Sequence, residues 1–193
     1  MSSREKILNA VKEAQPSLLP LPGIEITGNE KGNAHRFKTM LESIGGTVSF
    51  VGEGESITEK IRSLFPDSKR VVSSITSVEQ YFFKEYQQLK HHSLEDVDVA
   101  IIESRFGVAE NGAVWVTEED TKIRVLPFIG EHLVVVLAAN SIVATMHDAY
   151  EQIGNEDYHF GVFIAGPSKT ADIEQSLVLG AHGPKSMTVL LMC

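Results

Sequence analysis

Apolar positions along the chain follow two different spacings, and these predict alternating strands and helices. Apolar runs without polar alternation, at residues 98–103, 133–138 and 160–165, are typical of strands buried on both faces. Apolar residues recur at helical spacing in residues 33–43, 56–65 and 141–153. Further strands are expected at residues 47–51, 70–72, 108–116 and 187–191. This alternation predicts an α/β fold, with a mostly parallel, Rossmann-like sheet and helices on both faces.

The first 28 residues have a different pattern. Residues 4–14 predict an amphipathic helix with Ile7, Leu8 and Val11 on one face, capped by Ser2 or Ser3. Residues 15–28 contain three prolines and two glycines without clear periodicity. We therefore divide the chain into an N-terminal helix and strap, residues 1–28, and a single α/β domain, residues 29–193. The helix and strap either fold back or dock on a neighbouring subunit.

Charge and composition exclude several classes of function. The formal net charge of −9 argues against a nucleic-acid partner, because phosphate binding needs surfaces rich in Lys and Arg. The longest apolar run, residues 133–139, is far shorter than the roughly 20 residues of a membrane-spanning helix. The N-terminus lacks the apolar core of a signal peptide, so we expect a cytoplasmic protein without membrane insertion.

The single cysteine, Cys193, excludes a disulfide within the chain and a cysteine-ligated zinc or iron–sulfur site built from this chain alone. No two histidines stand four residues apart with a carboxylate, so no metal site is predicted.

Two Gly-Pro turns near the C-terminus predict a ligand site, because they bracket a segment between two buried strands. The candidate residues are Gly166, Pro167, Ser168, Lys169, Thr170, Asp172, His182 and Gly183. A short helix is expected after the first turn, and its free backbone N–H groups together with Lys169 would suit an anionic group of a small ligand. The alternative is a capped helix in which Asp172 only complements the helix dipole.

Glu110, Asn111 and Gly112 form a second candidate, since strand interiors disfavour these residues in succession. The alternative is a tight hairpin turn, for which Asn-Gly is the preferred dipeptide.

Arg124 lies in an apolar stretch, so we expect its guanidinium to pair with Glu110 or to clamp a bound carboxylate. An edge-strand arginine that reaches solvent is the alternative. His132 is either an acid–base group or a solvated residue at a strand start.

Ligands of doubly wound sheets bind beyond the carboxyl ends of the strands. We therefore expect the loops of Glu110 and Lys169 to face one crevice there. Glu110 and His182 are the candidate catalytic residues, and Arg124 and Lys169 would anchor a carboxylate.

Three segments are also similar to a known family. GPSKTADIE (residues 166–174), GAHGP (180–184) and FGVAENG (106–112) resemble the LUD-domain family, which comprises lactate utilization protein C and its relatives. The resemblance extends from about Lys31 to the C-terminus. It implies the fold shared with ribose-5-phosphate isomerase, glucosamine-6-phosphate deaminase and the CoA transferases.

The resemblance also implies a function. The chain would be a non-cluster subunit or accessory of an assembly that oxidises L-lactate to pyruvate, and it would bind a small carboxylate. No cofactor is expected on this chain; iron–sulfur clusters are expected on partner subunits, and a homo-oligomer is possible.

Two alternatives remain. Glu-Asn-Gly is similar to the active-site motif of class I CoA transferases, so Glu110 could be the nucleophile of a stand-alone CoA-transferase-like enzyme, or the carboxylate of a sugar-phosphate isomerase. In the third interpretation the motifs only stabilise turns and a subunit interface.

Overall fold

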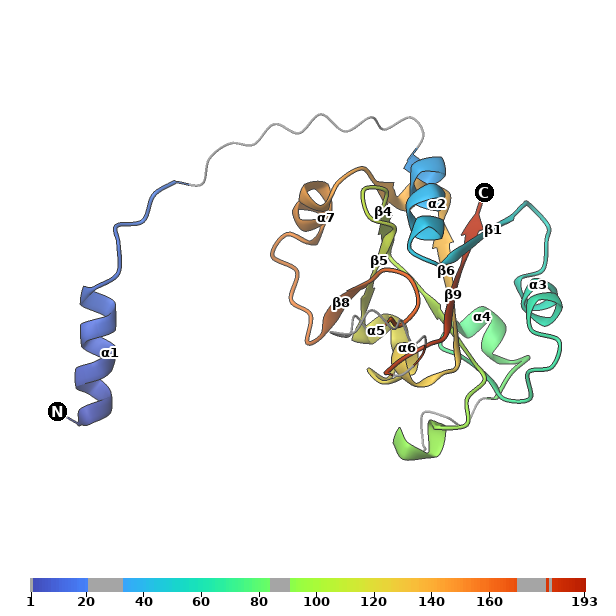
Figure 1. Ribbon diagram of the computed structural model, residues 1–193, viewed down its shortest axis with the longest axis horizontal. Helices are drawn as coiled ribbons and strands as arrows, with labels where there is room; N and C mark the ends of the chain where they lie inside the picture. The colour runs from blue at the N-terminus through green and yellow to red at the C-terminus, as the bar shows by residue number, and fades with distance from the viewer. Residues whose placement is uncertain (1, 21–32, 84–90, 170–179, 181) are drawn as a thin grey trace.

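The fold contains two β-sheets (Figure 1). The computed structural model describes residues 2–20, 33–83, 91–169, 180 and 182–193. The first sheet has five strands in the order β1-β9-β6-β3-β2 and the second has four in the order β7-β4-β5-β8. The strands of the first sheet are β1 (Thr47–Val51), β2 (Val71–Ser73), β3 (Val99–Glu103), β6 (His132–Ala138) and β9 (Ser186–Met192). The strands of the second are β4 (Phe106–Val108), β5 (Ala113–Thr117), β7 (Ile142–Val143) and β8 (Gly161–Ile164).

Every pairing in the first sheet is parallel, which confirms the predicted α/β class. Its strands are buried on both faces, and successive residues enter different cores. Ala100 and Ile102 of β3 pack in one core, whereas Val99 and Ile101 pack in the other. This two-sided burial explains why the strand sequences show no polar alternation.

The second sheet is mixed. β4 and β5 form an antiparallel hairpin, β5 pairs antiparallel with β8, and β7 pairs parallel with β4. The prediction of one strand over residues 108–116 is therefore wrong, and the hairpin alternative is correct. The chain reverses because Gly112 adopts a φ of +70°, which a glycine reaches without strain.

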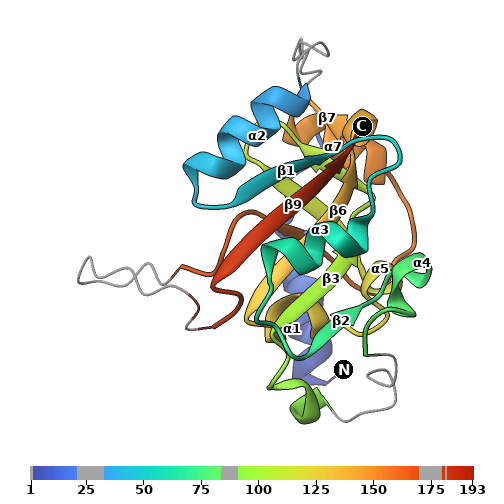
Figure 2. The same ribbon diagram turned by 90° about the vertical axis from the view of Figure 1, so that its right-hand side faces the viewer.

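Helices complete the layers (Figures 1 and 2). They are α1 (Ser3–Glu13), α2 (Asn33–Ser43), α3 (Ile57–Leu64), α4 (Thr76–Glu79), α5 (Glu118–Thr121), α6 (Leu126–Ile129) and α7 (Met146–Ile153), with 3-10 turns η2 (His91–Leu94) and η3 (Ala139–Ser141). Ile57 and Ile61 of α3 cover one face of the parallel sheet. Phe37 and Leu41 of α2, together with the second sheet, cover the other face. α7 packs on the outer face of the second sheet.

The helix expected over residues 141–153 begins later, at Met146. Ile142 and Val143 pair with β4 instead, so sheet pairing takes precedence over helical periodicity there. The helix then starts at a capping box, in which Thr145 Oγ1 accepts from the Asp148 N–H and Asp148 Oδ2 accepts from the Thr145 N–H.

α1 is capped by Ser2, one of the two predicted residues, which forms a capping box with Glu5. None of its residues is buried, and Figure 1 shows it apart from the sheets. Ile7, Leu8 and Val11 are therefore exposed. Among the described residues, no helix has the length and apolar content needed to cross a membrane.

The only tryptophan, Trp115 on β5, lies in an aromatic cluster on the outer face of the second sheet. Its ring centroid is 4.6 Å from that of Phe163 and 5.3 Å from that of Tyr158. A Cβ on Gly161 would lie 2.4 Å from the indole, so only glycine leaves room for the ring. The indole Nε1 is buried and has no hydrogen-bond partner among the described residues.

Asp98 joins the starts of two strands of the parallel sheet. Its Oδ2 accepts hydrogen bonds from the backbone N–H groups of Lys69, at 2.6 Å, and Arg70, at 2.7 Å. These bonds stabilise the charged carboxylate, so the Arg70 N–H above all holds the pKa of Asp98 below its ordinary value.

We predict that Asp98→Ala lowers the free energy of unfolding by about 1–2 kcal/mol at pH 7. Because the folded pKa lies below the unfolded value, this contribution is present above about pH 4 and is lost as pH falls through the folded pKa. Urea unfolding of both proteins at pH 7 and at successively lower pH measures it. A destabilisation that stays constant down to pH 2.5 would contradict this account.

Candidate functional site

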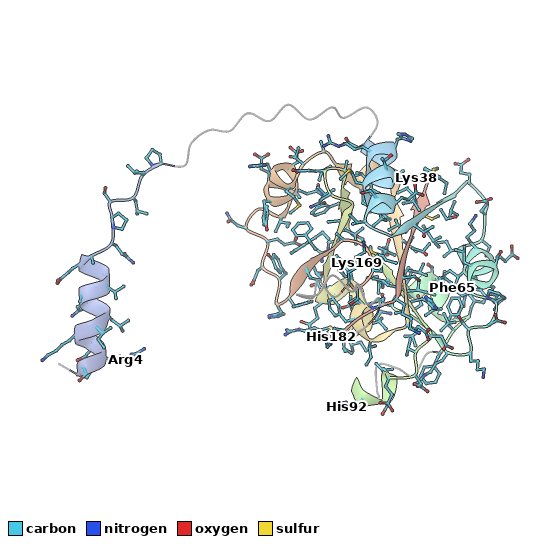
Figure 3. The ribbon with its side chains drawn as sticks, viewed as in Figure 1. Arg4, Lys38, Phe65, His92, Lys169 and His182 are labelled. Carbon is cyan, nitrogen blue, oxygen red and sulfur yellow. The ribbon has the colours of Figure 1, made fainter. Side chains whose placement is uncertain are left out.

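The two C-terminal Gly-Pro motifs are joined by backbone hydrogen bonds. The Ser168 N–H donates to the Pro184 carbonyl at 2.9 Å, and the Gly180 N–H donates to the Ser168 carbonyl at 3.1 Å. A Cβ on Gly183 would lie 3.2 Å from Ser168 Cβ. Lys169 and His182 are the sequence neighbours of this contacting pair, and both side chains are exposed (Figure 3).

The C-terminus of α2 contacts this pair of loops. The helix ends in a Schellman motif, in which the Gly46 N–H donates to the Leu41 carbonyl and the Gly45 N–H to the Glu42 carbonyl. Gly45 has a φ of +91°, and a Cβ there would lie 3.4 Å from Lys169 Nζ. The Lys169 ammonium group therefore lies beside the negative end of the helix dipole, which stabilises its charge.

The turn at residues 109–112 packs against the same helix. A Cβ on Gly112 would lie 2.7 Å from the Leu41 nitrogen, and one on Gly166 would lie 3.2 Å from Ile44 Cγ1. Val114 of β5 is opposite Ile164 of β8, so Gly112 and Gly166 lie two residues beyond that pair at one end of the second sheet. The structure thus brings the two predicted loops together around the last turn of α2.

Glu110 and Asn111 both have structural partners in this turn. Glu110 Oε2 accepts a hydrogen bond from the Met146 N–H, the first residue of α7, at 2.8 Å. A carboxylate at this position complements the positive end of the helix dipole. Asn111 Oδ1 accepts from the Ala113 N–H at 3.0 Å and so closes the hairpin turn.

Arg124 lies elsewhere, and the prediction that it pairs with Glu110 is wrong. Its Nη2 lies 2.9 Å from Glu118 Oε2, and its guanidinium lies 5.6 Å from the Phe160 ring centroid. This hydrogen bond, which Arg124 donates to the Glu118 carboxylate, lowers the pKa of Glu118 and raises the pKa of Arg124. Glu118 begins α5 directly after β5, at the end opposite Gly112. Arg124 does reach solvent, as in the alternative, but it lies between α5 and α6 and not on an edge strand.

His132, at the start of β6, contacts the neighbouring strand. Its Nδ1 lies 2.7 Å from Ser186 Oγ at the start of β9, and its ring centroid is 5.1 Å from that of Phe65. These contacts give His132 a structural role between two strands.

The loop at residues 166–169 follows β8, as predicted, but the C-terminal loops do not lie beyond the carboxyl ends of the parallel strands. Gly183 and Pro184 precede β9, and Gly45 and Gly46 precede β1, so the loops lie at the amino ends of the parallel strands. Thr170, Asp172 and the helix expected after the first turn lie outside the described residues.

A cavity of about 400 Å³ adjoins the second loop on its other side. Gly180, Gly183 and Lys185 line it together with four carboxylates, Glu95, Asp96, Asp98 and Glu131. These negative charges disfavour an anion, so an anionic ligand would be expected on the Lys169 side of the loops. Among the described residues, no three His, Cys, Asp or Glu side chains are placed to hold a metal ion.

Residues 77–192 match the family described as the LUD domain, which is more than half of the chain. The chain belongs to the LUD domain family. The resemblance seen in the three sequence segments is thereby confirmed.

Lactate utilization protein C of Geobacillus thermodenitrificans is 25% identical to this LUD-domain chain, over 98% of the chain and 80% of that protein. The protein of the same name from Oceanobacillus iheyensis is 30% identical over 51% of the chain. This second match spans 45% of that relative's length.

A crystal structure of a DUF162 family protein from Deinococcus radiodurans has the same fold. It covers 86% of this LUD-domain chain and 99% of its own, with a TM-score of 0.67 and 16% sequence identity.

Sequence reasoning identified the two Gly-Pro loops but missed the surface that holds them. Gly45 indicated only the end of a helix, whereas in the structure it also leaves room for Lys169. Gly46 leaves room for Leu41 of the same helix, so the pair of glycines gave no separate signal for the loop.

We predict that Gly112→Ala lowers the free energy of unfolding by about 3 kcal/mol, because it adds both a strained φ and a clash with the backbone of α2. Gly54→Ala is the matched control: its φ is +82°, but its Cβ would meet nothing within 4 Å, so a loss of about 1 kcal/mol is expected. Urea unfolding measures both. Equal losses would show that the contact with Leu41 contributes nothing.

Glu110→Ala is expected to lower the free energy of unfolding by about 1 kcal/mol, since the Met146 N–H loses its acceptor. Glu110→Gln keeps an acceptor oxygen and should cost less than half as much. Thermal unfolding at low salt measures the two variants. A Glu110→Ala protein as stable as the wild type would refute the capping role and leave the carboxylate available for chemistry.

Proposed function

We propose that this chain acts in lactate utilization, as a non-cluster subunit or accessory of an iron–sulfur assembly that oxidises L-lactate to pyruvate. The observation that carries the proposal is the alignment of 98% of the chain with a lactate utilization protein C. Membership of the LUD domain family supports the same role. A cytoplasmic location follows from this role as an expectation.

The chemistry divides naturally between subunits. Oxidation of L-lactate removes two electrons and two protons, one proton from the hydroxyl group and one from C2. The single Cys193 cannot by itself ligate a cluster, so the electrons would pass to clusters on partner subunits. This chain would then hold the carboxylate of the hydroxy acid.

The paired loops provide groups suited to that task. Lys169 supplies a positive charge at an exposed position, and it forms no salt bridge with any residue in the described parts of the chain. His182, two residues from Pro184 in the facing loop, would accept the hydroxyl proton. Glu110 is occupied by the Met146 N–H, so His182 is the better placed base.

An anaerobic pull-down of the tagged chain from its native cells, assayed for lactate-dependent dye reduction, tests the assignment. We expect iron–sulfur proteins to co-purify and the mixture to reduce dye only when L-lactate is present. A chain that is recovered alone and inactive would overturn the subunit role, and CoA thioesters and sugar phosphates would then be tested as substrates.

Steady-state kinetics of the recovered assembly can distinguish the roles of His182 and Lys169. His182→Ala is expected to lower kcat by about 100-fold or more, because a general base is lost. Lys169→Ala is expected to raise KM for lactate roughly tenfold, because a charge-assisted contact is lost. Steady-state dye reduction measures both.

His92→Ala and Lys38→Ala are the matched controls, since both side chains lie on other elements (Figure 3). We expect both to retain activity within about twofold of the wild type. If the loop variants behave like these controls while the assembly stays intact, the paired loops are not the carboxylate site.

A further inference from the structure

A groove of about 800 Å³ lies between the end of α3 and the edge strand β2 of the parallel sheet. It is formed by elements other than the paired C-terminal loops. Its lining residues are Ile61, Arg62, Phe65, Pro66, Ser68, Lys69, Arg70, Val71, Tyr81, Phe82, Phe83 and Asp96. A volume of this size accommodates a nucleotide-sized molecule.

Positive charge is concentrated in the groove. The chain carries a formal net charge of −9, but the groove is lined by three cationic side chains, Arg62, Lys69 and Arg70. Asp96 is the one carboxylate in the lining, and it is paired with Arg70. Arg62 forms no salt bridge with a described residue. A multiply charged anion is therefore favoured here.

Four aromatic rings also line the groove. Tyr81 and Phe83 remain 55% and 36% exposed, and Phe65 and Phe82 are half-buried beside them. The Arg70 guanidinium lies 4.7 Å from the Phe83 ring centroid, within the range of a cation–π contact. Exposed ring faces beside the cationic groups of Arg62 and Arg70 suit a planar ligand that carries acceptor oxygens.

We propose that this groove binds a phosphorylated aromatic ligand of the nucleotide class. Its ring stacks on the face of Tyr81 or Phe83, and its phosphate lies between Arg62 and Lys69. A phosphate monoester carries nearly two negative charges at neutral pH and so matches these two cations, whereas a single carboxylate would leave one unpaired. The proposal is independent of the lactate role, because no residue of the paired loops takes part.

Isothermal titration calorimetry on the full chain, in 50 mM salt, tests the ligand class. The probes are ATP and FMN. Adenosine and riboflavin supply the ring systems without phosphate, and inorganic triphosphate and ribose 5-phosphate supply the charge without a ring. We expect at least one phosphorylated aromatic compound to bind about tenfold or more tightly than either of its halves, and its affinity to fall as salt rises.

The site is located by variants at exposed positions, which leave the core intact. Arg62→Ala with Lys69→Ala is expected to weaken binding at least about tenfold, and Tyr81→Ala severalfold. Lys60→Ala, on the same helix but outside the lining, is the charge-matched control and should bind within about twofold of the wild type.

Three results would overturn the proposal. Binding of ribose 5-phosphate as tight as that of ATP and FMN would show a plain anion patch without ring recognition. Nucleotide affinity unchanged in the Arg62→Ala, Lys69→Ala protein would place the nucleotide elsewhere. Binding of poly-L-glutamate without any nucleotide binding would assign the groove to an acidic protein partner.

Discussion

The parallel sheet is stable only while both of its faces are covered, and the rest of the molecule follows from this constraint. β6 contributes Val135 and Leu137 to one core and Val134 and Val136 to the other, so no polar side chain fits in its interior. α3 covers one face, and the other needs both α2 and the second sheet. Polar groups that could do chemistry are therefore confined to the loops at the ends of the strands, where Lys169 and His182 are found.

This constraint also explains what the sequence could predict. Strands buried on both faces leave uninterrupted apolar runs, and α2 and β1 have the predicted bounds. The second sheet was not predicted as a sheet, because its strands are short and its pairings depend on distant residues. The partners of two polar side chains were also not predicted. Glu110 accepts a hydrogen bond from Met146, 36 residues further along, and Arg124 forms its ion pair with Glu118, six residues earlier. Sequence spacing identifies polar residues in unusual positions but does not identify what they touch.

The motifs that mark this family at the sequence level have a common physical basis around α2. Gly45, Gly112 and Gly166 come from three distant segments, and each lets backbone or a side chain approach the last turn of one helix. A substitution at any of these three glycines would displace a loop, although it would replace no side chain that could bind a ligand. The glycines and prolines thus fix the shape of the loops, which leaves few side chains in them to bind a ligand.

Trp115 is an intrinsic fluorescent probe of the second sheet. It is the sole indole of the chain, it is 4% exposed, and water does not reach its N–H group. Its emission therefore reports on the packing of β5, β8 and α7, whereas the parallel sheet carries no such fluorophore. If the outer layer opens before the parallel sheet unfolds, fluorescence would change while the far-ultraviolet circular dichroism stays constant. The fluorescence of Trp115 can therefore show whether the two sheets unfold as one cooperative unit or as two.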